Sequence, residues 1–274
     1  MNRTLNLWIF GIGVLLLISS CNNNPEPSKR IIVKGYDRHV ELQWEPVEGA
    51  KSYAVFVKKE DNSYTERANV QDTIYMDFVN DLGTELELSY KVEAQLNEGT
   101  ESLGEVTVAT RSMTDEELLD MVQYYTFRYF WEGAEPNSGM ARERVHMDGN
   151  YPQNDQNVVT TGGTGFGIFG LLAGIERNWV SKEEGIARFE RIVDFLEKAD
   201  RFHGVWPHWI HGESGKVKPF GNDDDGGDLV ESAFLMQGLL AVREYYKNGT
   251  EREKQLAQKI DELWNSMEWN WYTQ

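Results

Sequence analysis

The sequence predicts a multidomain chain: an all-β sandwich, then an all-α domain of the (α/α)6-barrel type that is present only as its first half. Apolar and polar residues alternate with period two between Lys29 and Arg111, which is typical of half-buried strands. After Met113 the apolar residues recur at helical spacing, and two segments there are apolar on every side. We assign residues 30–111 to the sandwich and residues 112–274 to the helical domain.

The amino-terminal segment has the features of a bacterial export signal. Arg3 precedes an apolar run, Leu7–Ile18, which is short for a membrane-spanning helix, and small residues follow it. Cys21 is the only cysteine and stands where a lipoprotein signal places its acylated residue. We expect a signal peptide and lipidation site in residues 1–21, a tether in residues 22–29, and an exported chain held by lipid in the cell envelope.

The charge of the chain restricts its partners. A formal net charge of −18 and a pI near 4.7 argue against nucleic acids and other polyanions. Apart from the membrane that holds the lipid, we therefore expect a neutral ligand. A single cysteine also excludes an internal disulfide.

The sandwich is predicted from short alternating segments separated by Gly, Asn and Asp turns. These segments include "HVELQW", "SYAVFVK" and "LSYKVEA". The stretch "VELQWEPVEGAKSYAVFV", with a core Trp44 and a later Tyr90, resembles a fibronectin type III module. The resemblance implies a spacer or docking domain, and the segment holds no catalytic constellation.

Three helices of the second domain are expected to lie on its outside. Each opens with the spacing of a capping box, in which a Ser or Thr oxygen and a Glu three residues on satisfy free backbone donors. Each then shows one apolar stripe and so buries one face. The capping boxes are Thr114–Glu117, Ser181–Glu184 and Thr250–Glu253.

Two further helices, residues 164–178 and 228–247, are apolar almost all round and belong in an interior. Outer and inner helices then alternate along the chain, which predicts a two-layer helical toroid. Five helices do not close such a ring.

The segment "GGTGFGIFGLLAG" contains the spacing G-x-G-x-x-G of a dinucleotide-binding turn. That interpretation needs a second strand and an acidic residue about 20 positions on. Glu190 falls there, but inside the amphipathic helix that begins after Ser181. We instead expect a packing stripe, because each interior Gly costs roughly 1 kcal/mol of helix stability and close approach of a neighbour or ligand must offset it. The stripe consists of Gly163, Gly167, Gly170 and Gly174.

A pair of carboxylates in "GNDDDGGDLVESAF" is the strongest catalytic candidate. Asp228 and Glu231 are three apart at a helix start, which places them on one face, roughly 5–6 Å apart at Cβ. Two carboxyl groups, one kept protonated, are the apparatus that cleaves a glycosidic bond. Capping of the helix alone explains Asp228, but it leaves Glu231 facing an apolar interior. The EF-hand spacing fails in every register, so we expect no metal.

The segment "FHGVWPHWIHGESGKVKPFG" is expected to form two extended arms around a turn at "GESG". His208 and His211 differ by an odd number and face opposite sides of a strand, which argues against zinc. We expect Trp206, His208 and Trp209 to stack on a sugar and hydrogen-bond to it. A packed hairpin over the barrel mouth is the alternative.

A third cluster lies in "YFWEGAEPNSGMARERVHMDGN". Trp131 and Glu132 end a helix, and Arg142 and Arg144 follow in a loop. Arginines beside a carboxylate pair orient it or hold substrate hydroxyls, and surface ion pairs are the alternative.

Four motifs in this order over about 160 residues are similar to the bacterial glycoamylase-like family that includes endo-β-1,2-glucanases. Members that resemble this chain are exported Bacteroidota lipoproteins, often with a fibronectin-like module ahead of an (α/α)6 barrel. The motifs are "FRYFWEGAEPNSGMARER", "TTGGTGFGIFGLLAGIERNWVSKEE", "VWPHWIHGESGKVKPFGNDDDGGDLVESAFLMQGLL" and "WNWY".

The resemblance implies inverting hydrolysis of a β-glucan without an organic cofactor, with Asp228 and Glu231 as the active-site acids. The expected substrate-binding residues are Trp131, Glu132, Arg142, Arg144, Trp206, His208, Trp209 and Asp225. A sugar-binding lipoprotein without catalysis is the alternative function. A polysaccharide lyase is a third, but it needs an anionic substrate, which the negative charge disfavours.

The family's barrel has twelve helices, whereas this chain stops at Gln274 after five expected ones. We therefore expect a truncated member, which cannot hydrolyse anything if one acid of the pair belongs to the missing half. An open edge of inner helices would also expose a large apolar patch.

Overall fold

The computed structural model describes residues 30–83, 85–146 and 149–273. The chain divides into two compact units, Met1–Thr114 and Asp115–Gln274. The predicted signal peptide, Cys21 and the tether lie outside the described residues.

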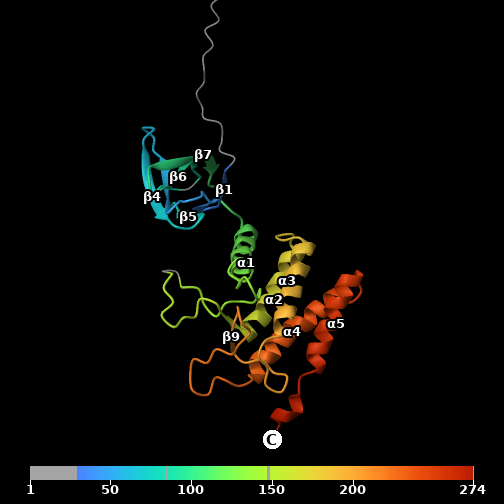
Figure 1. Ribbon diagram of the computed structural model, residues 1–274. Helices are drawn as coiled ribbons and strands as arrows, with labels where there is room; N and C mark the ends of the chain where they lie inside the picture. The colour runs from blue at the N-terminus through green and yellow to red at the C-terminus, as the bar shows by residue number, and fades with distance from the viewer. Residues whose placement is uncertain (1–29, 84, 147–148, 274) are drawn as a thin grey trace, which may run out of the picture. The chain divides into compact units, whose positions relative to one another are not determined.

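The first unit is an antiparallel β-sandwich. One sheet has the strand order β1-β2-β5 and the other β4-β3-β6-β7, which confirms the predicted fibronectin type III-like module (Figure 1). Its strands are β1 Ile31–Gly35, β2 His39–Trp44, β3 Ser52–Lys58, β4 Tyr64–Val70, β5 Ile74–Phe78, β6 Glu87–Gln95 and β7 Thr100–Ala109.

The interior of the sandwich contains Trp44 and Tyr90, as the alternation predicts. A buried carboxylate, Asp77, is satisfied there, because it accepts a hydrogen bond from the Tyr90 hydroxyl at 2.7 Å and pairs with Arg67 at 2.9 Å. This arrangement meets the demand that buried charge be paired and hydrogen-bonded.

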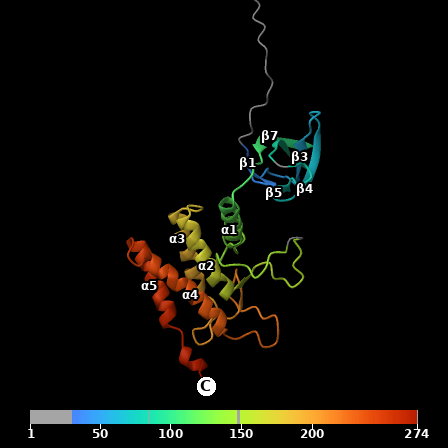
Figure 2. The same cartoon turned by 180° about the vertical axis from the view of Figure 1, so that it is seen from behind.

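The second unit is helical, and two inner helices form its centre (Figures 1 and 2). Helices α2 and α4 pack on each other, α1 and α3 contact α2, and α5 contacts α3 and α4. The predicted division into inner and outer helices is confirmed. The elements are α1 Asp115–Trp131, β8 Val158–Thr160, α2 Thr161–Glu176, α3 Lys182–Leu196, β9 Trp209–His211, α4 Leu229–Tyr246, α5 Glu251–Asn265 and a 3-10 turn, Trp269–Tyr272.

The glycines of α2 allow close approach on two sides. A β-carbon at Gly167 or Gly174 would stand 3.0 Å or less from the rings of Phe130 and Phe127 on α1. The predicted stripe therefore receives aromatic side chains from an outer helix. The contact between backbones lies off that stripe, at Gly165, where a β-carbon would stand 2.6 Å from the amide nitrogen of Leu235 on α4.

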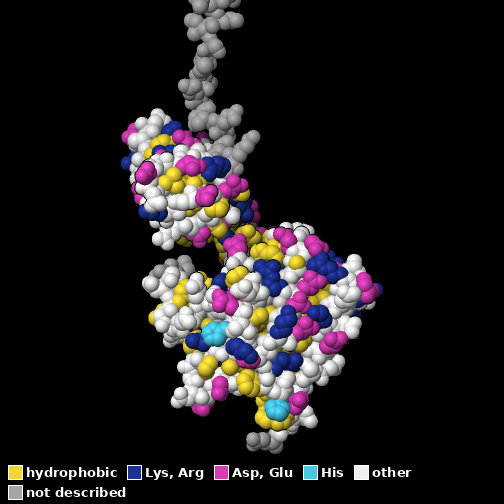
Figure 3. Space-filling model, viewed as in Figure 1, with side chains coloured by type: hydrophobic (Ala, Val, Ile, Leu, Met, Phe, Trp, Pro, Cys, Tyr) yellow, Lys and Arg dark blue, Asp and Glu magenta, His cyan; other side chains and the backbone are white. Residues whose placement is uncertain are grey.

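Local signals fix the starts of α3 and α5. The capping boxes predicted for these two helices are present, with Ser181 and Thr250 as caps and Glu184 and Glu253 as the reciprocal acceptors. Arg252 and Lys259 of α5 form ion pairs with three acidic side chains of α3 and with its C-cap residue (Glu183, Glu190, Asp194 and Glu197). Figure 3 shows this mixed charge on the helical unit.

The open edge of α2 and α4 carries exposed aromatic side chains. Phe166 is 61% exposed, and its ring centre lies 5.0 Å from that of Phe234, which is 42% exposed. Phe169 and Val230 on the same two helices are exposed as well. The expected apolar patch is therefore present. Across the described part of the chain, no helix has both the length and the apolar character needed to cross a bilayer.

Candidate active site

The starts of the two inner helices are tied to one short segment, residues 206–208. Strand β8 runs directly into α2 and pairs with β9, with Thr160 opposite Trp209. Thr161 donates its backbone N–H to the His208 carbonyl at 3.0 Å and its hydroxyl to the Pro207 carbonyl at 2.5 Å. Asp228, just before α4, donates its N–H to the Trp206 carbonyl at 2.9 Å. The two helix starts therefore meet beside His208.

His208 lies between the two predicted active-site acids. Its Nδ1 atom is 3.2 Å from Oδ2 of Asp228, and its Nε2 atom is 3.7 Å from Oε2 of Glu231. One imidazole thus faces a carboxylate on each of its nitrogens. Glu231 is 18% exposed, whereas Asp228 and His208 are about a third exposed, so the site opens to solvent.

Asp228 acts as the cap of α4. Its Oδ1 atom accepts the backbone N–H groups of Val230 and Glu231, each at 3.0 Å. Helix capping, the alternative role expected for Asp228 from the sequence, is therefore part of its role. Its other oxygen faces His208, so both oxygens are engaged.

Glu231 reaches across to the start of the other inner helix. Its Oε2 atom accepts the backbone N–H of Gly162 at 2.8 Å, in the first turn of α2, where the Thr160 side chain makes no cap. The positive end of a helix favours such a carboxylate. Among contacts between described residues, no hydrogen bond engages Oε1. That oxygen remains available to a ligand.

Gly162 makes room for this carboxylate. A β-carbon there would stand 2.9 Å from Cδ of Glu231 and closer still to Oε2. Sequence reasoning missed Gly162, because its partner is 69 positions away. The only local sign of a special role is the pair Gly162-Gly163 at the helix start, and we assign its second glycine to the packing stripe.

A small polar cavity of about 110 Å³ adjoins His208 and Asp228, but Glu231 does not line it. His208 and Asp228 line it together with Asp223 and Asp224. Asp225, which we expected to bind substrate, is exposed and does not line this cavity.

Trp209 extends the site on the other side of His208. Its ring stacks on the imidazole at 3.9 Å and meets Phe220 edge-on at 4.9 Å. The predicted extended arms are also present, because Ile210 bridges Val217 around the turn at residues 212–215.

Trp206 does not present a stacking surface, which corrects our expectation. Its side chain is 0% exposed and its Nε1 donates to the Leu196 carbonyl at 3.1 Å. The residue is part of the core of the helical unit. Its backbone, however, joins the segment to α4 through Asp228 and Ser232.

The third predicted cluster does not converge on the carboxylate pair. Glu132 forms an ion pair with Arg128 one turn earlier at 2.8 Å, and Trp131 lies under the guanidinium of Arg188 at 4.3 Å. Burial lowers the pKa of Arg188 to about 10. The contact with Arg188 joins the end of α1 to α3, whereas the ion pair of Glu132 stays at the end of α1.

Arg142 and Arg144 support the loop before β8. Arg142 donates to three backbone carbonyls, those of Gly133, Ala134 and Gln156, at 2.8–3.0 Å. Arg144 lies 3.5 Å from the buried Asp155 and above the ring of Phe220, which connects it to Trp209. Arg142 is therefore a brace, and only Arg144 is linked to the site, through Phe220.

No group of three or more His, Cys, Asp and Glu side chains within the described residues is arranged to hold a metal ion.

Comparison with known proteins identifies relatives, although no family model matches. The chain is 46% identical over 249 residues to an exo β-1,2-glucooligosaccharide sophorohydrolase (non-reducing end) of Parabacteroides distasonis, a match that covers 88% of this chain and 33% of the relative. The chain therefore spans about a third of the length of this curated relative.

Solved structures agree with this similarity. A β-1,2-glucanase of Parabacteroides distasonis matches with a TM-score of 0.77 and 42% identity, over 90% of this chain and 35% of that one. An endo-β-1,2-glucanase of Chitinophaga pinensis, solved with sophorotriose and glucose, matches with a TM-score of 0.58 and 61% identity, over 59% and 38%. A putative glucoamylase of Bacteroides caccae matches with a TM-score of 0.57 and 67% identity, over 58% and 38%.

Proposed function

The chain is a homologue of the β-1,2-glucanases and glucoamylase-like proteins of Bacteroidota, and from that premise we propose that it serves the hydrolysis of a β-1,2-linked glucan. The observation that carries the proposal is the position of Glu231. This carboxylate is mostly buried at the start of α2, beside His208, with one oxygen available to a ligand. Neutral glucan also suits a chain of net charge −18, which repels polyanions.

In this proposal Glu231 transfers the proton. Inverting hydrolysis needs a carboxylic acid that protonates the leaving oxygen, and a carboxylate that takes a proton from the water attacking the anomeric carbon. The Gly162 N–H holds Oε2, so Oε1 is the oxygen that would carry the proton to the glycosidic oxygen of a bound glucan. His208 hydrogen-bonds to Asp228 at 3.2 Å and lies 3.7 Å from Glu231, so it separates the two carboxylates.

Asp228 positions the site. Its two oxygens are occupied by the backbone of α4 and by His208, so it is poorly placed to activate water as well. Asp223 and Asp224 are the other carboxylates of this chain that line the cavity beside His208. We assign them as the candidates for the base.

The test is release of reducing ends from linear β-1,2-glucan by the 274-residue chain. Glu231→Gln should reduce turnover by about 10³-fold or more while glucan affinity changes only a fewfold, since general acid catalysis and positioning both depend on it. Undiminished turnover by this variant would overturn the assignment. Asp223→Asn and Asp224→Asn identify the base by which of them loses turnover.

A sugar-binding lipoprotein without catalysis is the second candidate. The engagement of Asp228 as a helix cap favours it, because it leaves one fewer carboxylate for chemistry. Binding of the glucan without any release of reducing ends would decide for this candidate.

We also propose that the chain is exported and anchored by a lipid on Cys21, for which the support is the sequence alone. Expression in a bacterium with radiolabelled palmitate should label the protein, and Cys21→Ser should abolish the label. A wild-type protein that remains unlabelled would contradict the anchor.

A further inference from the structure

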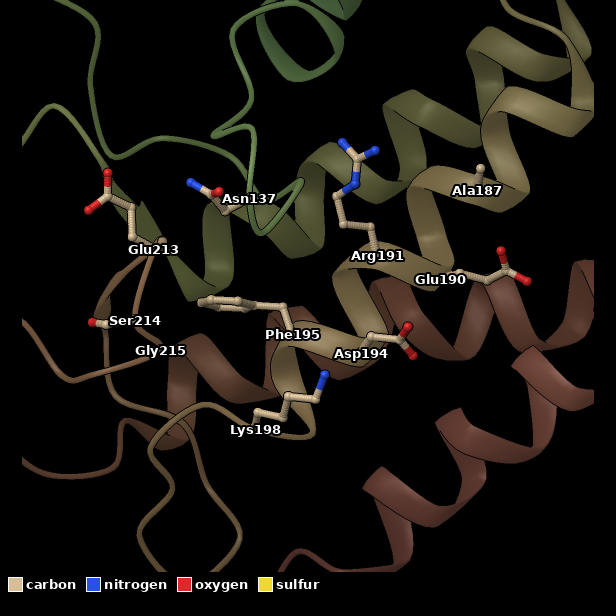
Figure 4. Close-up of a pocket in the computed structure, with 11 residues that line it drawn as sticks. Asn137, Ala187, Glu190, Arg191, Asp194, Phe195, Lys198, Glu213, Ser214 and Gly215 are labelled. Atoms are coloured by element: carbon tan, nitrogen blue, oxygen red, sulfur yellow. The ribbon is translucent and has the colours of Figure 1, made fainter.

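A second cavity lies on the outside of the helical unit, away from His208 and the carboxylates. It has a volume of about 510 Å³, within the range of small-ligand sites, and lies between the outer face of α3 and the turn at residues 212–215. Figure 4 shows Phe195 in its middle, with Asn137 and Glu213 around the ring. We call it the α3 groove, and it shares no lining residue with the cavity beside Asp228.

The polar side chains of the α3 groove are held in place from behind. Glu135 is fully buried and accepts the Asn137 side-chain N–H at 2.7 Å, and a β-carbon at Gly212 would stand 2.6 Å from its Cδ. Burial acts to raise the pKa of Glu135, but hydrogen bonds from Ser138 and Asn137 outweigh it and hold that pKa below its usual value. Asn157 donates to the Glu213 carboxylate at 2.7 Å.

The charges that line the α3 groove are nearly balanced. Glu190 and Asp194 are neutralised by Arg252 and Lys259 of α5 at 2.6 and 2.7 Å. Arg191, Lys198 and Glu213 remain, so both hydrogen-bond donors and acceptors surround one aromatic ring. A neutral ligand with many hydroxyl groups fits such a lining, because Arg191 and Lys198 donate hydrogen bonds and Glu213 accepts them. A polyanion would gain from the two cations but would be repelled by a chain of net charge −18.

We infer that the α3 groove is a second binding site for neutral oligosaccharide, with Phe195 under the apolar face of a sugar ring and with Asn137, Glu213 and Ser214 bonded to its hydroxyls. The inference rests on the proposed function only for the linkage of the sugar. A glucan held there contacts the turn that follows His208 by a few residues. Strand β9 joins His208 to that turn and spans about 13 Å from residue 208 to residue 212 at about 3.3 Å per residue, so a long glucan bound in the groove stays close to the first site.

The test uses the full chain with His208→Ala, which disables the first site, titrated calorimetrically with a β-1,2-linked glucose pentasaccharide. Phe195→Leu keeps an apolar side chain against the core but removes the ring, and should weaken binding by about tenfold. Ser214→Trp should block the groove by bulk. Phe166→Leu, at an exposed phenylalanine of α2, is the matched control and should bind like its parent.

Thermal unfolding of each variant shows that it is folded. Equal affinity of the parent, Phe195→Leu and Ser214→Trp proteins would overturn the inference, as would binding of an acidic oligosaccharide in preference to the neutral one. With His208 intact, Phe195→Leu should slow hydrolysis of long glucan and spare that of short oligosaccharides. If the groove binds glucan but the chain hydrolyses none, only the proposed function is refuted. If the chain hydrolyses glucan but no binding depends on Phe195, only the inference about the groove is refuted.

Discussion

Replacing Gly162 by alanine separates the chemistry of the site from the stability of the fold. The added β-carbon would stand 2.9 Å from Cδ of Glu231, so the carboxylate has to withdraw. The variant then loses the hydrogen bond of 2.8 Å from the Gly162 N–H to Oε2. A bond to a charged group is worth roughly 1.5–3 kcal/mol, and alanine returns about 1 kcal/mol of helix propensity. We expect a net loss of stability of only about 0.5–2 kcal/mol.

The effect on turnover should be much larger. A displacement of about 1 Å at a reacting group costs on the order of 10²-fold in rate. Denaturant unfolding measures the first quantity, and release of reducing ends from linear β-1,2-glucan measures the second. If the 274-residue chain proves inactive by itself, the same substitution can be made in a full-length relative.

Gly170→Ala is the matched control on the same helix. Its β-carbon would meet only Phe130, at an ordinary 3.7 Å, so the variant should gain up to about 1 kcal/mol and keep full turnover. A Gly162→Ala protein that turns over like this control, or whose structure shows Glu231 unmoved, would refute the account of the site.

Three further predictions concern the rest of the helical unit. Arg142→Met should destabilise the protein by about 2–4 kcal/mol in denaturant unfolding and leave glucan affinity unchanged, because Arg142 donates hydrogen bonds to three backbone carbonyls. Weakened affinity without lost stability would instead show that Arg142 binds the substrate. The ammonium of Lys182 at 2.6 Å and the cap of α5 lower the pKa of Glu253 from 4.5 to about 2. The resulting stabilisation, about 1–2 kcal/mol, is fully present above pH 4.5 and lost as the pH falls towards 2. Glu253→Gln should flatten this part of the curve of unfolding free energy against pH. An unchanged curve would contradict the role given to Glu253. Phe166→Ser with Phe234→Ser should reduce binding of a hydrophobic dye and self-association measured by sedimentation, and equal values would mean that the apolar edge is not the adhesive surface.

Features encoded over short stretches could be predicted from the sequence. Alternation in "HVELQW" and the capping boxes at Ser181 and Thr250 are local patterns, and they specified strand and helix starts. The interior placement of α2 and α4 also followed from composition, because a helix that is apolar on every side has no polar face to expose to solvent.

Features that depend on distant partners could not. A tryptophan such as Trp206 can stack on a sugar or pack in a core. Its hydrogen bond to the Leu196 carbonyl, which places it in the core, cannot be predicted from the sequence. Arg142 has the same charge whether it faces a substrate or three carbonyls. Phe195 stands next to a buried position of α3, and the sequence alone does not show that it lines a groove. The groove forms only because a turn that begins 17 residues later packs against this face of the helix.

The segment at residues 206–208 works as a common anchor for two helix starts. Thermal fluctuations that displace α2 must carry His208 with them, and those that displace α4 are transmitted through the same peptide groups. We therefore expect the relative positions of Gly162, His208 and Glu231 to change little while these hydrogen bonds persist. Heat should therefore abolish ligand capture at this site only when the whole helical unit melts, in a single cooperative step.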